Sequence, residues 1–560
     1  MIEFTTRPEL RGSFGAVAST HWLATSVGMS VLERGGNAFD AAVAAGFTLQ
    51  VVEPHLNGPG GDLPAVFWPV SRGEPVVLCA QGVAPAGATI SRFRELGHVQ
   101  VPGTGLLAAC VPGAFGGWLL LLREFGTWRL EDVLAYAIGY AEHGYPVVPQ
   151  ITQAIETAEP LLREWPGSAE LYLPAPRAGT TFRNPQLAAT WKRLIDEAHG
   201  ASREQEIERA HEAFYEGFVA DEIDRFSRAN AGVLVGDDLA QWRPTLEPPA
   251  TFDYRGLTVC KTGPWGQGPA GLQQLALLQG FDVADMSELE FVHVVAECAK
   301  LAFADRDANY GDALPVPLET LLSAEYNDAR RALVNDEASA ELRPGLGRLP
   351  ALHEAVDALA LGAGEPTLRD TVHLDVADRF GNLFAATPSG GWLQSSPTIP
   401  AFGWPLGTRA QMFWLEEGLG SSLVPRTRPR TTLSPGLVLR GGEPWLAYGT
   451  PGGDHQEQWA IHVLLRHVDR GLNLQEAIDA PEFQTGHLIG SFFPRGFEPR
   501  TLSIEERAGA NVVRELAARG HDVTVEPPWS LGRVSAIARE NGEFRAGANP
   551  RGMQGYAVAR

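Results

Sequence analysis

Thr371 stands at the start of an alternating pattern and carries a hydroxyl that could act as a nucleophile. Thr371, His373 and Asp375 alternate with apolar residues, and this period of two predicts a strand that ends in the turn at 378–382. A surface hairpin would explain the pattern. Cleavage of the chain before Thr371 is the other interpretation, because it would leave a free amine beside the hydroxyl.

A glycine cluster offers a second piece of chemistry. Gly452 and Gly453 follow the apolar run 443–448 and precede a helical pattern that starts near His455. Consecutive backbone N–H groups ahead of a helix can hold a developing negative charge, as in an oxyanion hole. A plain strand-to-helix turn is the alternative interpretation.

Other motifs carry less weight. Residues 266–271 match GxGxxG, but Pro269 removes a backbone donor and no acidic residue follows about 20 positions later, which disfavours dinucleotide binding. The four cysteines are far apart and have no His at metal-ligand spacing, so we expect buried, reduced thiols and no metal site.

Helix and strand patterns must position these residues. Residues 334–368 are rich in Ala, Gly, Pro and acidic side chains, and they predict a mobile connector directly before the threonine. Strands are predicted at 371–388 and 434–450. Helices are predicted at 35–52, within 107–145, at 288–305, 471–480 and 503–519.

Composition indicates a large globular protein. The 560 residues are 44% apolar with a net charge of −22, which argues against nucleic acid or an anionic membrane as partner and favours small molecules. The first twenty residues lack an apolar signal region, and no stretch approaches the roughly 20 apolar residues of a membrane helix. A cytoplasmic protein is therefore expected.

Five separated motifs together resemble the gamma-glutamyltransferase (gamma-glutamyltranspeptidase) family of N-terminal nucleophile hydrolases. They are the run from Ala16 to Asp62, the Ala-Asp-Arg segment within Phe303–Asp312, Thr371–His373, Thr431–Pro435 and Gly449–Gly453. Their order matches that of the family, and the similarity runs nearly from end to end.

The resemblance implies an α+β fold, a four-layer αββα sandwich made as a precursor that cleaves itself. The break would fall between Asp370 and Thr371, giving a large subunit, 1–370, and a small catalytic subunit, 371–560, that are intertwined in one structural unit. Residues 334–370 would be the flexible pre-cleavage segment. Two such heterodimers could associate.

The resemblance also implies roles for individual residues. Thr371 would be the nucleophile, and its freed α-amine, with an ordinary pKa of about 7.7–8.0, the base. Gly452 and Gly453 would form the oxyanion hole, and Ser389 would support the nucleophile. Water or an amine would accept the acyl group, and no metal or organic cofactor is implied.

Substrate contacts are implied for Gln411, Arg430, Thr431 and Thr432. Arg409 and Arg428 also lie in this segment and could bind a carboxylate with Arg430. The glutamyl-binding pattern of the family is altered, however. Ile90, Gly391 and Trp414 stand where an arginine, an asparagine and an aspartate are expected.

These residues leave several hypotheses open. The first is an amidohydrolase or acyltransferase of γ-glutamyl or related small acidic amides, similar to glutathione hydrolases. The second is an acylase or amidohydrolase with a non-glutamyl substrate, of the oxamate, glutaryl or cephalosporin type. The third, from another class, is an unprocessed binding or scaffold homologue that performs no catalysis.

Overall fold

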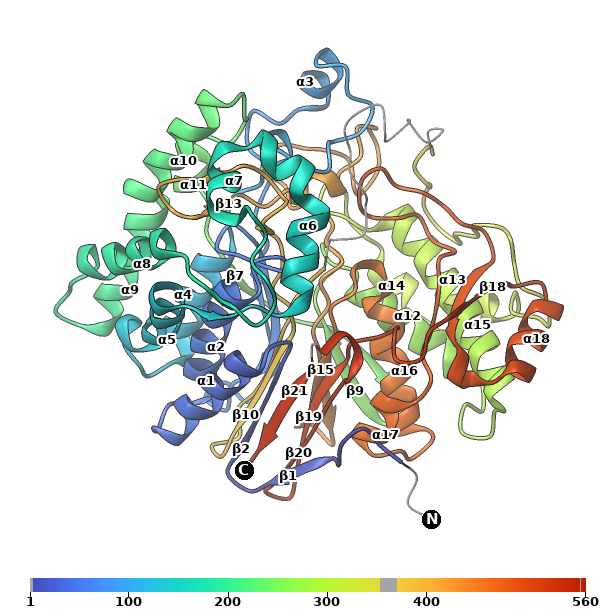
Figure 1. Cartoon of the computed structure of the whole chain (residues 1–560). Helices are drawn as coiled ribbons and strands as arrows, with labels where there is room; N and C mark the ends of the chain where they lie inside the picture. Colours follow the sequence, from blue (N-terminus) through green and yellow to red (C-terminus); the bar gives the residue numbers. More distant parts are fainter. Residues whose placement is uncertain (1–3, 353–369, 554) are drawn as a thin grey trace.

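The computed structural model describes residues 4–352, 370–553 and 555–560. Strands run through the middle of the molecule, and helices lie on both sides of them (Figure 1). Of the connector predicted before the threonine, residues 353–369 lie outside the described residues, and 334–352 contain neither helix nor strand. No helix among the described residues has both the length and the apolar character needed to cross a bilayer.

Two seven-stranded sheets form the centre, and every neighbouring pair within them is antiparallel. The first contains, in spatial order, β1 (Leu10–Gly12), β20 (Glu543–Ala548), β19 (Ser535–Glu540), β15 (Glu443–Gly449), β14 (Gly436–Arg440), β9 (Leu257–Lys261) and β8 (Ala250–Tyr254). The second contains β21 (Tyr556–Ala559), β2 (Gly15–Ser19), β10 (Leu374–Asp378), β11 (Leu383–Ala386), β3 (Leu63–Trp68), β4 (Val76–Ala80) and β7 (Thr245–Glu247).

Small side chains line the space between the two sheets. Ala16, Ala18, Ala377, Ala385 and Ala447 belong to one buried cluster that draws on strands of both sheets. Because alternate residues of a strand point to opposite faces, each of these strands packs its other face against helices. The sheets therefore share one apolar layer.

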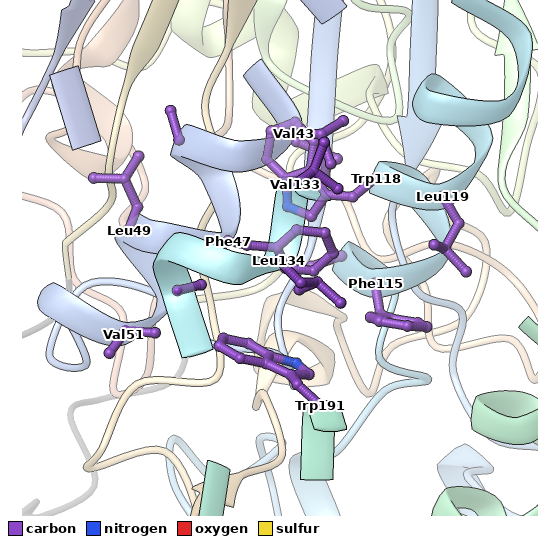
Figure 2. Packing of buried hydrophobic residues seen from close by; sticks show 14 of the residues in the cluster. Val43, Phe47, Leu49, Val51, Phe115, Trp118, Leu119, Val133, Leu134 and Trp191 are labelled. Carbon is purple, nitrogen blue, oxygen red and sulfur yellow. The ribbon is translucent and has the colours of Figure 1, made fainter. Parts of the chain in front are cut away.

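The helices of one side come from the first half of the chain. Figure 2 shows their core, in which Phe47 of α2 lies near Phe115 and Trp118 of α4 and near Trp191 of α8. Helix α2 is Ala- and Val-rich and buried along its whole length, and Asn37 caps its start. The helices are α1 (Trp22–Glu33), α2 (Ala38–Val52), α3 (Ile90–Glu95), α4 (Ala114–Phe125), α5 (Leu130–His143), α6 (Pro149–Glu164), α7 (Pro166–Tyr172), α8 (Pro185–Glu197), α9 (Arg203–Tyr215), α10 (Phe218–Ala229) and α11 (Gly236–Ala240).

A second group of helices packs on the first sheet through a separate apolar cluster. These helices are α12 (Gly268–Leu278), α13 (Glu288–Asn309), α14 (Leu318–Leu321), α15 (Ala324–Arg331), α16 (Gln456–Val468), α17 (Leu474–Asp479) and α18 (Ala510–Ala518). A mixed three-stranded sheet lies beside them, in which β17 (Thr501–Glu505) pairs antiparallel with β16 (Phe483–Thr485) and parallel with β18 (Asp522–Glu526). Two-stranded pairs complete the fold: β5 (Tyr145–Pro146) with β6 (Thr181–Phe182), and β12 (Thr398–Ile399) with β13 (Trp404–Pro405).

The predicted elements are confirmed with one correction. Strands β10, β11, β14 and β15 occupy the predicted strand segments, and α2, α4, α5, α13 and α17 the predicted helical ones. The helix predicted at 503–519 is wrong at its start, because residues 501–505 pair with β16 and β18 as strand β17. Cys79, Cys110, Cys260 and Cys298 are free and buried, as expected.

Candidate active site

Thr371 lies just before β10 and is 3% exposed. Its Oγ1 donates to Ser389 Oγ at 3.2 Å, and the two residues also form an isolated β-bridge. Ser389 follows β11, the hairpin partner of β10. The hairpin thus brings the predicted nucleophile and its predicted supporting hydroxyl together, although 18 positions separate them.

The carbonyl of Asp370, which precedes Thr371, accepts two hydrogen bonds. Trp392 Nε1 donates to it at 2.7 Å and Ser389 Oγ at 3.2 Å. The Asp370 side chain accepts from Thr371 N–H at 2.9 Å and forms an ion pair with Arg533. Two donors therefore polarise the carbonyl that adjoins the threonine hydroxyl.

Backbone packing holds Ser389 in place. Asp62 and Ser389 exchange backbone hydrogen bonds of 2.7 and 3.1 Å, and a Cβ on Gly61 would lie 2.2 Å from the Ser389 carbonyl oxygen. Arg409 Nε donates to Asp62 Oδ2 at 2.7 Å in a buried ion pair. The glycines at the end of the 16–62 motif are thus needed because the two backbones touch.

His373 anchors the strand that carries Thr371. Its ring bonds to Thr387 Oγ1 at 3.0 Å and to Asp375 Oδ1 at 2.8 Å. Burial raises the pKa of Asp375, and the nearby His373 opposes that rise. A Cβ on Gly449 would lie 2.3 Å from the imidazole, so the end of β15 lies directly beside the start of β10.

The loop after β15 carries the predicted oxyanion glycines. Gly452 and Gly453 have φ angles of 126° and 56°, in the region that favours glycine. A Cβ on Gly452 would lie 2.1 Å from the Trp459 ring, and one on Gly453 would lie 3.3 Å from Phe492. The Phe492 ring lies 6.2 Å from that of Trp392, so this loop and the Asp370 carbonyl line the same region.

The predicted substrate residues surround that loop. Gln267 Nε2 donates to the carbonyls of Thr432 and Gly453, at 2.8 and 3.0 Å, and ties the two motifs together. Thr431 is fully buried, and its N–H donates to Trp265. The Thr432 Oγ1 is buried without a hydrogen-bond partner among the described residues.

Two further predicted substrate residues lie nearby. Arg430 donates through Nη2 to Ser491 Oγ at 2.7 Å. Gln411 donates to the Gly103 carbonyl at 3.2 Å and accepts from Phe493 N–H at 3.3 Å. Both side chains are buried, so they line the interior of the protein and not its surface.

The predicted arginine cluster is wrong in two of its three members. Arg428 is engaged by Asp312 at 2.7 Å and by Glu247 at 2.7 Å. Arg409 is paired with Asp62. These carboxylates neutralise Arg409 and Arg428. Among the described residues, Arg430 forms no ion pair with a carboxylate, and its Nη1 has no hydrogen-bond partner.

The three altered positions have structural roles of their own. Ile90 starts α3 and packs against an apolar cluster with Phe93. Gly391, at φ +66°, lies against Gly60 and Gly61, and a Cβ there would be 2.9 Å from the Gly61 nitrogen. Trp414 is buried, and the guanidinium of Arg495 lies 4.0 Å above its ring.

Sequence patterns missed several residues of this site. Trp392 and Arg533 contact Asp370, and Arg495 donates to the backbone carbonyls of Gln411 and Phe413 at 2.6 and 2.8 Å. All three lie in segments without helix or strand, so no periodicity marked them. Their proximity to the threonine depends on the fold.

Comparisons with known proteins find similar sequences and similar folds. A family model described as Gamma-glutamyltranspeptidase matches residues 24–559. The Glutathione hydrolase-like YwrD proenzyme of Bacillus subtilis (strain 168) is 32% identical over 561 residues and 98% of each chain. The solved structure of LmbA2991HD is 53% identical over the whole of both chains, with a TM-score of 0.95. The solved cephalosporin acylase from Bacillus halodurans is 30% identical over 100% of this chain and 98% of its own, with a TM-score of 0.87.

Proposed function

Because the chain belongs to the gamma-glutamyltranspeptidase family, we propose that it cleaves itself before Thr371 and then acts on small acidic amides. Thr371 is the nucleophile in both reactions. The observation that carries the proposal is the Asp370 carbonyl, which is held by Trp392 and Ser389 beside the threonine hydroxyl. This arrangement serves attack on a carbonyl, and the proenzyme name of the YwrD relative supports self-processing.

Self-processing begins when Thr371 Oγ1 attacks the carbonyl carbon of Asp370. The C–N bond between the two residues breaks, and the nitrogen takes a proton and becomes the α-amine, which leaves an ester on the threonine. Water hydrolyses this ester and releases Asp370 as a new carboxylate. Nucleophile and base then belong to one residue, since the α-amine has a pKa near neutrality.

Turnover repeats this chemistry on an external amide. The α-amine takes the Thr371 hydroxyl proton during attack, while the N–H groups of Gly452 and Gly453 stabilise the oxyanion. The amine of the substrate leaves with a proton, and water or an acceptor amine removes the acyl group. Ser389 Oγ, at 3.2 Å, orients the nucleophile throughout.

The acyl group belongs to a γ-glutamyl or related acid in this proposal. Thr431, Thr432 and Gln411 lie around the oxyanion loop, and Arg430 supplies a buried positive charge. An acidic group suits that charge because an unpaired buried guanidinium is costly.

A second candidate, an acylase with a non-glutamyl substrate, is favoured by Trp414. Trp414 occupies the position where the family pattern has an aspartate that would bind an α-ammonium. Here the indole is buried and the Arg495 guanidinium lies above it. The name of the cephalosporin acylase neighbour supports this candidate as well.

Two intertwined subunits, 1–370 and 371–560, form one four-layer αββα unit in this proposal. Each central sheet contains strands from both segments: β9 pairs with β14 in one, and β2 pairs with β10 and β3 with β11 in the other. Separation of the segments would break both sheets, so the cleaved chains stay together.

The test is the intact mass of the purified protein under denaturing conditions, beside a Thr371→Ala variant. We expect two chains in the wild type, the smaller beginning at Thr371, and one uncut chain in the variant. A wild-type chain that stays uncut on long incubation at neutral pH would refute the proposal and favour the scaffold hypothesis.

A further inference from the structure

Five charged residues gather behind the oxyanion loop. Arg306 pairs with Asp307 at 2.8 Å and with Asp454 at 2.7 Å, and the charges of the same two carboxylates act on Arg430 and Arg495. Three guanidinium groups therefore face two carboxylates. Within the described part of the chain, this group keeps one positive charge without a counter-ion.

Both aspartates are already engaged by Arg306 and by donors of the segment 489–491. Asp454 accepts from Arg306 and Ser491 Oγ through Oδ1, and from Ser491 N–H at 2.9 Å through Oδ2. Asp307 accepts from Arg306 through Oδ1 and from the N–H of Ile489 at 3.0 Å through Oδ2. Their hydrogen bonds hold the loop and its neighbours together.

Three donor atoms beside this group have no hydrogen-bond partner among the described residues. Arg430 is 5% exposed, and its Nη1 has no hydrogen-bond partner among the described residues. The same holds for Arg495 Nε and for Thr432 Oγ1. A buried donor without a partner costs stability, and native proteins satisfy nearly all such groups with protein, water or ligand.

Burial lowers the pKa of both arginines. It lowers the pKa of Arg430 to about 10, with a contribution from Arg306, and the pKa of Arg495 to about 9, with a contribution from Arg430. An anion placed between the two guanidinium groups would reverse this effect. The site therefore suits an anion on electrostatic grounds as well.

The group also adjoins the nucleophile. Asp454 directly follows Gly453, and Phe492, which lies between Ser491 and Arg495 in the chain, packs near Trp392. Trp392 in turn donates to the Asp370 carbonyl. Gly452, Phe492 and Arg495 are partly exposed, so solvent and small molecules can reach this side of the site.

Resting on the proposed function, we infer that Arg430 and Arg495 bind the terminal carboxylate of the acyl group and select monoamides of dicarboxylic acids that lack an α-ammonium. The planar fork of a guanidinium matches the geometry of a carboxylate. An α-ammonium on the neighbouring carbon would face both arginines, while Asp307 and Asp454 are already engaged. A glutaryl amide therefore fits better than a γ-glutamyl amide of the same length.

The experiment compares three p-nitroanilides of equal chain length on protein whose processing is verified by mass. Glutaryl anilide carries the carboxylate, γ-glutamyl anilide carries the carboxylate and the ammonium, and pentanoyl anilide carries neither. We expect the highest kcat/KM for the glutaryl anilide. In Arg495→Gln and Arg495→Lys, kcat/KM for this substrate should fall by about tenfold or more, and for pentanoyl anilide by less than about threefold.

Arg500→Gln is the matched control. Arg500 lies in the same segment and also has a positive φ, 63° against 60° for Arg495, but it is exposed. Processed protein that prefers γ-glutamyl anilide, or whose Arg495 variants lose all three activities equally, would overturn the inference and leave the proposed function standing. A chain that is never processed would overturn the proposed function, and the inference with it.

Discussion

Trp392 Nε1 donates to the carbonyl oxygen of Asp370 at 2.7 Å, at the peptide bond that precedes Thr371. The same indole N–H also donates to the Leu56 carbonyl at 2.8 Å, within the Ala16–Asp62 motif, and so fixes the ring between the two segments. A donor held in this way is already oriented when negative charge develops on the Asp370 oxygen.

Trp392→Phe should therefore slow self-processing by about a hundredfold, because loss of one oriented donor typically reduces a carbonyl reaction by this order. The phenyl ring keeps the packing against Phe492. The time course of cleavage, followed by denaturing mass spectrometry after expression in the cold, measures the effect. Trp128→Phe is the control, since the Trp128 ring lies under Arg34 and packs against the helical core. Equal rates in the two variants would contradict the role of Trp392.

Ser389→Ala should lower kcat of the processed enzyme by about tenfold, because Thr371 Oγ1 loses a hydrogen bond that orients it. The steady-state rate on the best anilide measures this change. Ser168→Ala removes a comparable buried hydroxyl, bonded to Thr398 at 3.0 Å, and should leave kcat unchanged. A normal kcat in Ser389→Ala would show that Thr371 needs no support from this hydroxyl.

Gly61→Ala should destabilise the protein by more than about 2 kcal/mol, since the new Cβ would lie 2.2 Å from the Ser389 carbonyl oxygen and 2.4 Å from that of Gly390. Backbone atoms on both sides cannot move apart without disturbing Ser389. Gly139→Ala in α5 is the control, because nothing lies within 4 Å of its Cβ position, and it should be neutral or slightly stabilising. Thermal unfolding of both variants gives the comparison. Similar Tm values for Gly61→Ala and Gly139→Ala would contradict the prediction.

His55 should make the protein less stable in mild acid. Burial, followed by the charges of His21 and Arg533, lowers the pKa of His55 to about 3, against 6.5 for an unperturbed histidine. Between these two values the unfolded chain binds a proton that the folded chain does not, so stability falls as the pH drops below 6.5. The loss from pH 7 to pH 5 is about 2 kcal/mol for this residue.

His55→Phe removes this titration, so its free energy of unfolding should change less between pH 7 and pH 5 than that of the wild type. Denaturant unfolding at the two pH values gives the comparison. His143→Phe, at a histidine whose side chain is 79% exposed, should retain the wild-type pH dependence. An unchanged pH dependence in His55→Phe would mean that His55 binds its proton equally well in the folded and the unfolded chain.

Local patterns in the chain determined much of this protein. The period of two before Asp378 predicts β10 correctly, and the capping residues Asn37 and Asp40 agree with the start of α2. Strand alternation and helix capping both depend on near neighbours in the chain. The types and spacing of Thr371, Gly452 and Gly453 also indicate their chemistry without any knowledge of the fold. The helix predicted at 503–519 was wrong at its start because the pairing of residues 501–505 with β16 and β18 outweighed local preference.

Only the tertiary structure decided which charges are free. Arg409 and Asp62 are 347 positions apart and yet neutralise each other, whereas Arg430 has no such carboxylate among the described residues. All arginines carry the same charge in the sequence, and whether one can bind a substrate depends on partners that distant segments bring to it. In our proposal, local sequence therefore marks Thr371 as the nucleophile, while the choice of acyl group depends on how Arg430, Arg495 and their neighbours are packed.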